Sequence, residues 1–408
     1  MRHVLFLLIL ITTALLPADA GTADLNPTLA VGIFSGRGLT ACTITGHAPI
    51  TLADESGHQL AELPAGAAVT VAADDGKVSV LCERPRGKGE SAQYVLTSSS
   101  PIEIKPDGSK ARAYRGTIEI SVRDGHLALI DRIALEDYLR GVLPSEIPSS
   151  FSREALRAQA IAARTYAITS TRKHGVEGFD LCDGPHCQVY LGVTGERPAT
   201  DAAVRDTAGL VLTYQGKLIQ AVYCDSCGGR TAGNETAWQG SDSLPYLRPV
   251  ADADEHGALC DQSPRNVWTR QIPQSKLAAA LVKFKVAAPI TAIEPVSTDA
   301  NGRPQAYAIC GSQGEVTIRG GVLRDAVNRA LGATTLPSAD FTAAPNGDSF
   351  VFAGRGSGHG VGLCQWGANA MAKAGRTATE ILAHYYTGAT VEPISAEVAS
   401  RGGQRGSG

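Results

Sequence analysis

The chain has 408 residues, 43% of them hydrophobic, and a formal net charge of −3 at pH 7. A chain so close to neutral lacks the broad basic field that supplies most nucleic-acid affinity. We therefore expect neither nucleic acid nor an anionic membrane surface as a partner, and the length fits two domains with substantial cores.

Residues 1–20 have the pattern of a cleavable signal peptide. Arg2 precedes an apolar stretch, and the segment closes with Pro17 and an AxA-like end at Ala18 to Ala20. A membrane-spanning helix would need about 18 to 20 apolar residues, and Thr12 and Thr13 break this one. We expect an exported protein, in the periplasm or at the cell wall, with no membrane anchor after cleavage.

Residues 21–100 are predicted to form a small β-rich module. Short alternating runs are separated by turn clusters such as SGRG and DDGK. The cysteines of this module are Cys42 and Cys82, which makes them the first disulfide to expect. The chain has nine cysteines in all, so either one thiol stays free or some cysteines bind a metal.

Residues 101–395 are predicted to mix helices with short antiparallel strands. The Asp-Gly pair at 124–125 indicates a hairpin turn. A helix over 134–143 is expected to stop at Pro144, and the next helix starts with Ser152 as N-cap. Further strands and Gly-rich turns follow from 207 to 304, and then a hairpin over 305–320 and a helix over 323–332.

The last part of the chain has the clearest local signals. A glycine-rich loop, GRGSGHGVG, opens onto a helix over 363–374, and Thr377 with Glu380 predicts a capping box. Residues 396–408 are small, basic and Gly-rich, which predicts a disordered tail. The fold class is therefore α+β, with the β-rich module at the N-terminal end.

Glu146 is placed between two predicted helices, in LPSEIPSSF, where Pro144 and Pro148 restrict the backbone. A carboxyl whose pKa is raised by burial can protonate a glycosidic leaving oxygen. An ordinary surface glutamate is the alternative. Glu136, Asp137 and Glu154 are expected to be solvated or capping charges, and Glu235 is a weaker candidate for a second carboxylate.

Several long segments together resemble the sporulation stage II D/LytB family. They are DYLRGVLPSEIPSSFSREALRAQAIAARTYAI, LCDGPHCQVYLGV, AVYCDSCGGRTAGNETAW, GGVLRDAVNRALG and GRGSGHGVGLCQWGANAMAKAGRTATEILAHYYTG. The resemblance implies a lytic transglycosylase that cleaves the MurNAc–GlcNAc bond of peptide-stripped peptidoglycan glycan strands, with Glu146 as general acid and base. It also implies substrate contacts, for which the candidates are Gln188, Tyr190, Ser226, His359 and Gln365.

Cys182 and Cys187 have a spacing that suits zinc, with His174 or His186 as a third ligand. The resemblance implies such a site in some members of the family, and we take His174, Cys182 and Cys187 as the ligand set. A Cys182–Cys187 disulfide is an equal alternative. No cofactor is required for the chemistry, and zinc would shape the site. Elsewhere, Cys227–Cys260 is the preferred disulfide, with Cys224, Cys310 and Cys364 unassigned.

Two other functions remain open at this point. LytB-type relatives are described as enhancers of a wall amidase, so this chain could bind peptidoglycan without cleaving it, with a cell-wall amidase as partner. A zinc-dependent wall amidase is the third reading, although the sequence has no HExxH pair.

Overall fold

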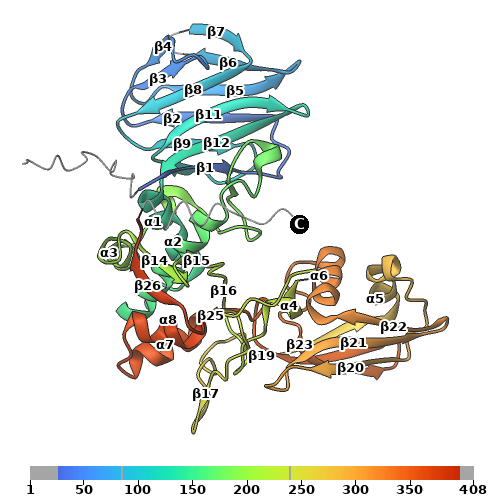
Figure 1. Ribbon diagram of the computed structural model, residues 1–408. Coiled ribbons are helices and arrows are strands. Elements are labelled where there is room, and N and C mark those ends of the chain that lie inside the picture. Colours follow the sequence, from blue (N-terminus) through green and yellow to red (C-terminus); the bar gives the residue numbers. More distant parts are fainter. Residues whose placement is uncertain (1–25, 84–85, 239, 396–408) are drawn as a thin grey trace, which may run out of the picture.

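The computed structural model describes residues 26–83, 86–238 and 240–395. The predicted signal peptide and the predicted disordered tail lie outside the described residues. The chain folds as α+β with a β-rich N-terminal part, as the sequence predicts. Figure 1 shows three bodies: layered sheets at one end, a helical body below them, and a lobe to one side.

The N-terminal body consists of two sheets whose buried side chains face each other, with β5 contacting β12 and β6 contacting β8. The first sheet has the order β13 (Leu181–Cys182), β1 (Thr28–Ile33), β12 (His126–Ala134), β11 (Thr117–Arg123), β8 (Gln93–Ser98), β3 (Ile50–Ala53) and β4 (Gln59–Leu63). The second has the order β10 (Arg112–Tyr114), β9 (Ile102–Pro106), β2 (Ala41–Gly46), β5 (Ala68–Asp74), β6 (Lys77–Glu83) and β7 (Arg86–Ser91).

The first sheet continues past residue 100, because β8 pairs with β11 and β11 pairs with β12 as far as Ala134. Arg123 pairs with His126, and Asp124 and Gly125 between them both have positive φ, as a two-residue hairpin turn requires. The expected Cys42–Cys82 disulfide is not formed. The two thiols are free and lie on β2 and β6. Strand β5 lies between these strands, and two strand spacings, about 9 to 10 Å, exceed the reach of a disulfide.

The edge strand β13 comes from far along the chain and pairs in parallel with β1, so that Cys182 lies opposite Gly32. The next residue, Asp183, accepts hydrogen bonds from Phe34 N (2.8 Å) and from the Arg112 guanidinium (2.8 Å). The segment around Cys182 is therefore fixed directly to the N-terminal sheets.

The helical body is built around α2, whose alanine-rich face is buried as predicted, with Leu156, Ala160, Ala163 and Ala167 all in the core. Small side chains allow neighbouring backbones to approach closely. Its elements are α1 (Leu135–Glu146), α2 (Arg153–Thr169), η1 (Gly175–Glu177), η2 (Gly192–Gly195), α3 (Pro198–Asp206), α7 (Gln365–Lys373), α8 (Ala378–Tyr385), β14 (Leu210–Tyr214), β15 (Lys217–Leu218) and β26 (Thr390–Pro393).

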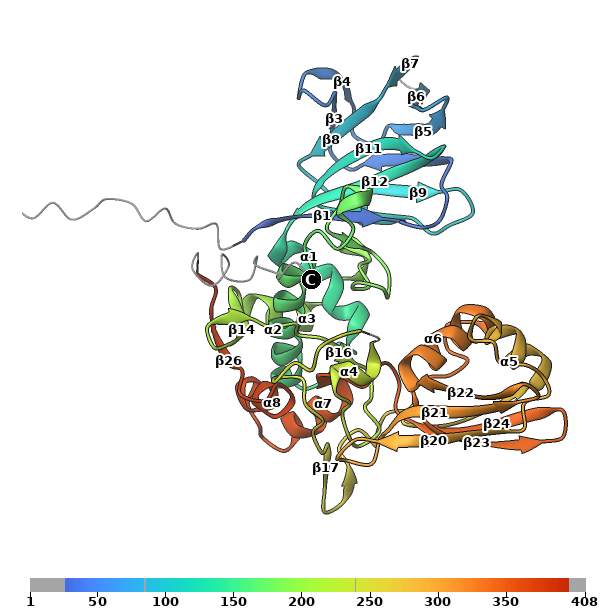
Figure 2. The same ribbon diagram turned by 45° about the vertical axis from the view of Figure 1, so that its right-hand side comes forward.

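The side lobe has a hydrophobic core of its own, centred on residues such as Tyr307, Phe341 and Phe352. Two three-stranded sheets and three helices surround it: β19 (Val267–Pro273), β24 (Ser349–Arg355) and β23 (Asp340–Asn346); β20 (Ala292–Thr298), β21 (Pro304–Gly311) and β22 (Gly314–Arg319); and α5 (Gln274–Ala280), η3 (Val282–Phe284) and α6 (Gly320–Leu331). Figures 1 and 2 both show this lobe beside the helical body, joined to it through short connecting elements.

The connecting elements are one short helix and two pairs of two-residue strands: α4 (Asn234–Ala237), β16 (Tyr223–Cys224) with β25 (Leu363–Cys364), and β17 (Ala253–Asp254) with β18 (Gly257–Ala258). Within the described residues, no helix has the length and apolar character needed to cross a membrane.

One predicted helix end is wrong. Helix α1 continues through Pro144 and ends at Glu146, with Ile147 as C-cap. Proline removes one backbone donor and crowds the carbonyl four residues earlier, but at 144 this affects only the last turn. Glu146 therefore belongs to the end of a helix and not to a loop between two helices. The start of α2 after Ser152 and the Thr377–Glu380 capping box are confirmed.

Arg164 ties α1 to α2 and provides a test of this packing. Its guanidinium is fully buried and donates to both oxygens of Glu136, each at 2.7 Å. Removing one partner of a buried pair typically costs about 3–5 kcal/mol, so Arg164→Met should lower the free energy of unfolding by roughly that amount in urea titrations. Arg153→Met is the control, because Arg153 is 73% exposed beside Asp206 and such pairs contribute only about 0–1 kcal/mol. Equal losses in the two variants would contradict the assignment.

Candidate active site

A cleft of about 1010 Å³ lies between the helical body and the side lobe. The helical side contributes Glu146 from α1 and Tyr166 from α2, whereas α6 of the lobe contributes Arg324, Asp325 and Arg329. The cleft walls therefore come from segments far apart in sequence. Its remaining lining residues are Thr169, Ser170, Lys173, Pro185, His186, Cys187, Val189, Gln220, Val222, Tyr223, Trp238, Asn328, Ala333 and His359.

Glu146 is half-buried in the cleft wall, and its Oε1 accepts a hydrogen bond from the backbone N–H of Val189 at 2.7 Å. Burial raises the pKa of this carboxyl to about 7, and the Val189 hydrogen bond opposes the rise only in part. No arginine or lysine forms an ion pair with Glu146 among the described residues. A carboxyl in this setting is available as a proton donor near neutral pH.

His359 faces the same cleft from the glycine-rich loop. Its Nδ1 accepts a hydrogen bond from Val361 N at 3.0 Å, and its ring lies 5.0 Å from that of Trp238. Burial, together with the nearby charge of Arg324, lowers the pKa of His359 to about 3. The imidazole is therefore neutral at physiological pH, with Nε2 as its donor, and can offer a hydrogen bond but no positive charge.

Four other predicted substrate contacts lie behind the cleft wall. Gln188 is fully buried and bonds Tyr138 Oη, Ala163 O and Tyr223 Oη. Tyr190 donates to Asp131, and Ser226 donates to Asn266. Gln365 bonds Gln159 at 3.4 Å. None of these four side chains lines the cleft, so the structure gives them a supporting position. Only Glu146 and His359 of the predicted acid and contact residues reach its surface.

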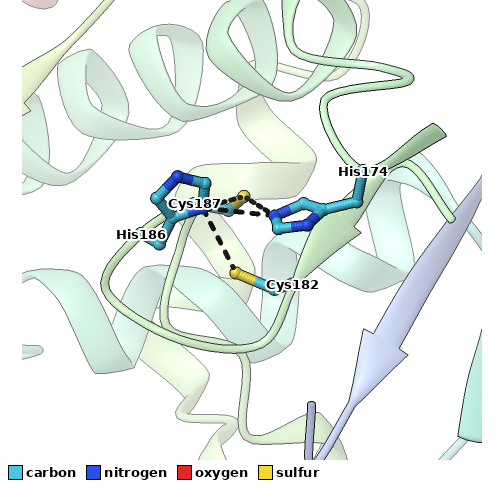
Figure 3. Close-up of side chains that lie close together, drawn as sticks. All are labelled: His174, Cys182, His186 and Cys187. Atoms are coloured by element: carbon cyan, nitrogen blue, oxygen red, sulfur yellow. Dashed lines mark hydrogen bonds between the residues drawn. The ribbon is translucent and has the colours of Figure 1, made fainter. Parts of the chain in front are cut away.

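His174, Cys182, His186 and Cys187 gather at the edge of the same cleft. Figure 3 shows the four side chains pointing toward one another, and their ligand atoms all lie within 4.8 Å of each other. Cys187 Sγ lies 3.3 Å from His174 Nε2, and the two imidazoles approach to 3.2 Å. His174 and His186 are alternative third ligands in the prediction from sequence, and the structure brings both imidazoles into the cluster.

This geometry fits a tetrahedral zinc ion. Zn–N and Zn–S bonds of about 2.0 and 2.3 Å place ligand atoms roughly 3.3 to 3.8 Å apart. Glu177 Oε2 holds His174 Nδ1 at 2.5 Å, which leaves Nε2 for a metal, as is usual for liganding histidines. The hydrogen bond between the two thiols lowers the pKa of Cys182 to about 4 and raises the pKa of Cys187. The two sulfurs are free thiols here.

The other carboxylates named from the sequence are engaged elsewhere. Glu235 pairs with Arg248 at 2.6 Å, and that hydrogen bond lowers the pKa of Glu235. Glu154 bonds Arg157 and the N-terminus of α8 at Ala378. Asp137 pairs with Arg140. Neither Glu235 nor Glu154 lines the cleft. The second carboxylate on its surface is Asp325, which pairs with Arg324 at 3.2 Å.

Sequence reasoning missed Trp238, Tyr166, Tyr223 and the cationic side chains of α6. Trp238 is 36% exposed at the cleft, so its indole ring is available for contact with a bound ligand. It directly follows α4 and ends the segment AVYCDSCGGRTAGNETAW, but no periodic pattern there indicated that its side chain would face a cleft.

The fold and the site together give the class of protein to which this chain belongs. It is an α+β protein with an acid-bearing cleft beside a thiol–imidazole cluster. The family model described as Stage II sporulation protein (SpoIID) matches residues 123–214, a range that contains Glu146 and the thiol–imidazole cluster. The chain belongs to the SpoIID family, as its motifs indicate.

Three relatives show the extent of the similarity. Stage II sporulation protein D of Bacillus amyloliquefaciens is 32% identical over 64% of this chain and 75% of its own length. Stage II sporulation protein D of Bacillus subtilis is 29% identical over 75% of this chain and 89% of its own length. The amidase enhancer of Bacillus subtilis is 31% identical over 62% of this chain, and the match spans 40% of that protein.

The raised pKa of Glu146 can be tested directly. Because the pKa lies above the usual value, the carboxyl should remain protonated to about pH 7 and lose its proton above it. Carbon-13 NMR of glutamate carboxyls in the folded chain should show a signal titrating near neutrality that disappears in Glu146→Gln. Glu235 is the internal control, since its pKa is lowered by Arg248. Titration of Glu146 near pH 4 would refute the assignment.

Proposed function

We propose that this protein is an exported lytic transglycosylase that cleaves the MurNAc–GlcNAc bond of peptide-stripped peptidoglycan strands. The observation that carries the proposal is the single unpaired carboxyl, Glu146, with its pKa near 7, on the wall of a cleft of about 1010 Å³. Hydrolases of glycosides ordinarily use two carboxylates. In this cleft the other described carboxylate, Asp325, is paired with Arg324.

One carboxyl suffices when the substrate supplies its own nucleophile. Glu146 gives its proton to the glycosidic oxygen as the bond from that oxygen to C1 of MurNAc breaks. The carboxylate then takes the proton of the MurNAc 6-hydroxyl as O6 bonds to C1, so the proton balance closes without water and leaves a 1,6-anhydro end. The Val189 N–H holds Oε1 in position for both transfers.

The cleft surface suits a glycan that carries lactyl carboxylates, which are freed when stem peptides are removed. Lys173, Arg324 and Arg329 line it, and cations of this kind can pair with carboxylates. Trp238 offers a face for sugar stacking, and His359 offers a neutral donor. These features support stripped strands as the substrate class.

We further propose that zinc is held by His174, Cys182, His186 and Cys187. When bound, zinc supplies a tetrahedral tie between ligands, and four protein ligands leave no open position of the kind that catalytic zinc needs. The site would thus stiffen the segment 182–189, which ends at the N–H that holds Glu146. This ligand count disfavours a zinc-dependent amidase.

A non-catalytic role is the second candidate, because one relative carries the name amidase enhancer. In that case the cleft would bind glycan and a cell-wall amidase would be the partner. Product analysis separates the two functions.

The decisive experiment incubates the mature chain with peptide-free glycan strands and measures product masses. We expect anhydromuramyl ends, one water lighter than hydrolysis products, and a loss of rate of at least about 10²–10⁴-fold in Glu146→Gln, the usual contribution of a general acid or base. Asp325→Asn is the matched control in the same cleft and should retain turnover. Reducing ends that depend on both residues would indicate a hydrolase, and glycan binding without products would favour the amidase-enhancing role.

Zinc removal gives an independent test. Chelation should lower the thermal midpoint of the wild-type chain by several degrees, because metal bound only by the folded state stabilises it. Cys187→Ser should start from a lower midpoint than the wild-type chain and should lose less on chelation than the wild-type chain does. Cys310→Ser serves as control, since Cys310 lies partly exposed on a hairpin away from the cluster. An unchanged midpoint in Cys187→Ser would refute the proposed site.

A further inference from the structure

A second group of ligand-type side chains lies away from the cleft. Cys227, Asp252, Cys260 and Cys364 are all buried, and their ligand atoms lie within 4.8 Å of one another. Cys227 Sγ is 2.9 Å from Asp252 Oδ2 and 4.0 Å from Cys260 Sγ. Cys260 Sγ also contacts Asn266 Oδ1 at 3.4 Å. The four residues span 137 positions of sequence and meet where β16, β17 and α7 come together.

Asp252 is the unusual member of this group. It has no exposed surface, and it accepts hydrogen bonds from the Cys227 thiol and from Tyr385 Oη at 2.7 Å. Among the described residues its one ion-pair partner is His384, whose Nε2 is 3.8 Å away. A buried carboxylate is costly unless a cation accompanies it. The surroundings therefore favour a positive charge beside Asp252.

Cys364 is a second residue whose surroundings suit a bound cation. It is the N-cap of α7 and accepts hydrogen bonds from Cys227 N (3.3 Å) and Gly367 N (3.4 Å). Backbone donors and a helix N-terminus stabilise a thiolate. Gly367 is required there, since a Cβ would lie 2.5 Å from Asp252 Oδ2 and 2.2 Å from Tyr385 Oη.

We propose that Cys227, Asp252, Cys260 and Cys364 form a second metal site, which takes zinc through three thiolates and one carboxylate. Tetrahedral zinc with Zn–S bonds of about 2.3 Å separates sulfurs by roughly 3.8 Å, close to the 4.0 Å between Cys227 and Cys260. Binding releases the thiol protons to solvent, and Tyr385 orients the carboxylate from behind.

A Cys227–Cys260 disulfide is the competing arrangement. It would consume two of the three sulfurs and leave Asp252 with His384, 3.8 Å away, as its one ion-pair partner among the described residues. A metal satisfies all four groups at once. It would also join the CDSCGG loop to Cys364, the N-cap of α7, which lies five residues after His359, and so hold one wall of the cleft.

The test uses the full mature chain, folded and purified with zinc under reducing conditions, with metal content measured by mass spectrometry. In a Cys182→Ser/Cys187→Ser background, which removes the proposed cleft-edge site, we expect one zinc per chain. Adding Cys260→Ser should abolish it. Tyr385→Phe, which keeps all four ligands, should weaken zinc binding by about 10–100-fold and covers the case in which Cys260→Ser fails to fold.

Cobalt(II) provides a readout of ligand type, since thiolate ligation gives an intense charge-transfer absorption. We expect this band in the double-serine background, and its loss in Cys260→Ser. A folded double-serine chain that binds no zinc or cobalt, or peptide mapping that finds a Cys227–Cys260 disulfide in the zinc-treated protein, would overturn the proposal. These readouts do not involve glycan cleavage, so they are independent of the proposed activity.

Discussion

The hydrogen bond from Val189 N to Glu146 is the contact on which the rest of the site depends, because it comes from a segment that is fixed at several points. Leu181 and Cys182 pair with β1, Asp183 bonds Phe34 and Arg112, and Gln188 bonds three partners in the core. The nine residues from Leu181 to Val189 thus couple the N-terminal sheets, the thiol–imidazole cluster and the acid. A shift at any of these anchors would move the donor that positions Glu146.

Glu146 differs from several other carboxylates in having no arginine partner. Glu136 bonds Arg164, Glu196 bonds Arg115 and Arg140, and Glu235 bonds Arg248. Arg248 lowers the pKa of Glu235, whereas burial raises that of Glu196 even beside its two arginines. Glu146 receives one backbone hydrogen bond and is half-buried, so desolvation decides its pKa. Arg324 and Arg329 of α6 line the cleft across from the acid, and Lys173 lines it from outside the side lobe.

Local signals in the sequence predicted local structure well. The turn at Asp124–Gly125 and the capping box at Thr377–Glu380 depend on residues a few positions apart, and both are confirmed. The predicted end of α1 before Pro144 was wrong, because the effect of a proline depends on where in a helix it lies and the last turn tolerates it. The motifs also led to Glu146 and His359, but not to which neighbouring side chains face the cleft. Gln188 and Tyr190 follow Cys187 closely, yet both turn inward, because their partners Tyr138 and Asp131 belong to other elements.

Long-range assembly could not be predicted from spacing. Cys227 and Cys364 meet because β16 and β25 pair in parallel and Ser226 pairs with Ser357. This seam also carries the glycine-rich loop, where Gly356, Gly358 and Gly362 each have positive φ. A Cβ atom added at any of the three would lie within about 3 Å of an atom of the opposite segment, so only glycine fits there. The seam sets the position of His359 relative to Glu146. These two residues are far apart in sequence, yet they line one surface in space. A rigid seam therefore matters to the proposed chemistry, since proton transfer from Glu146 would depend on where the two cleft walls hold the sugar.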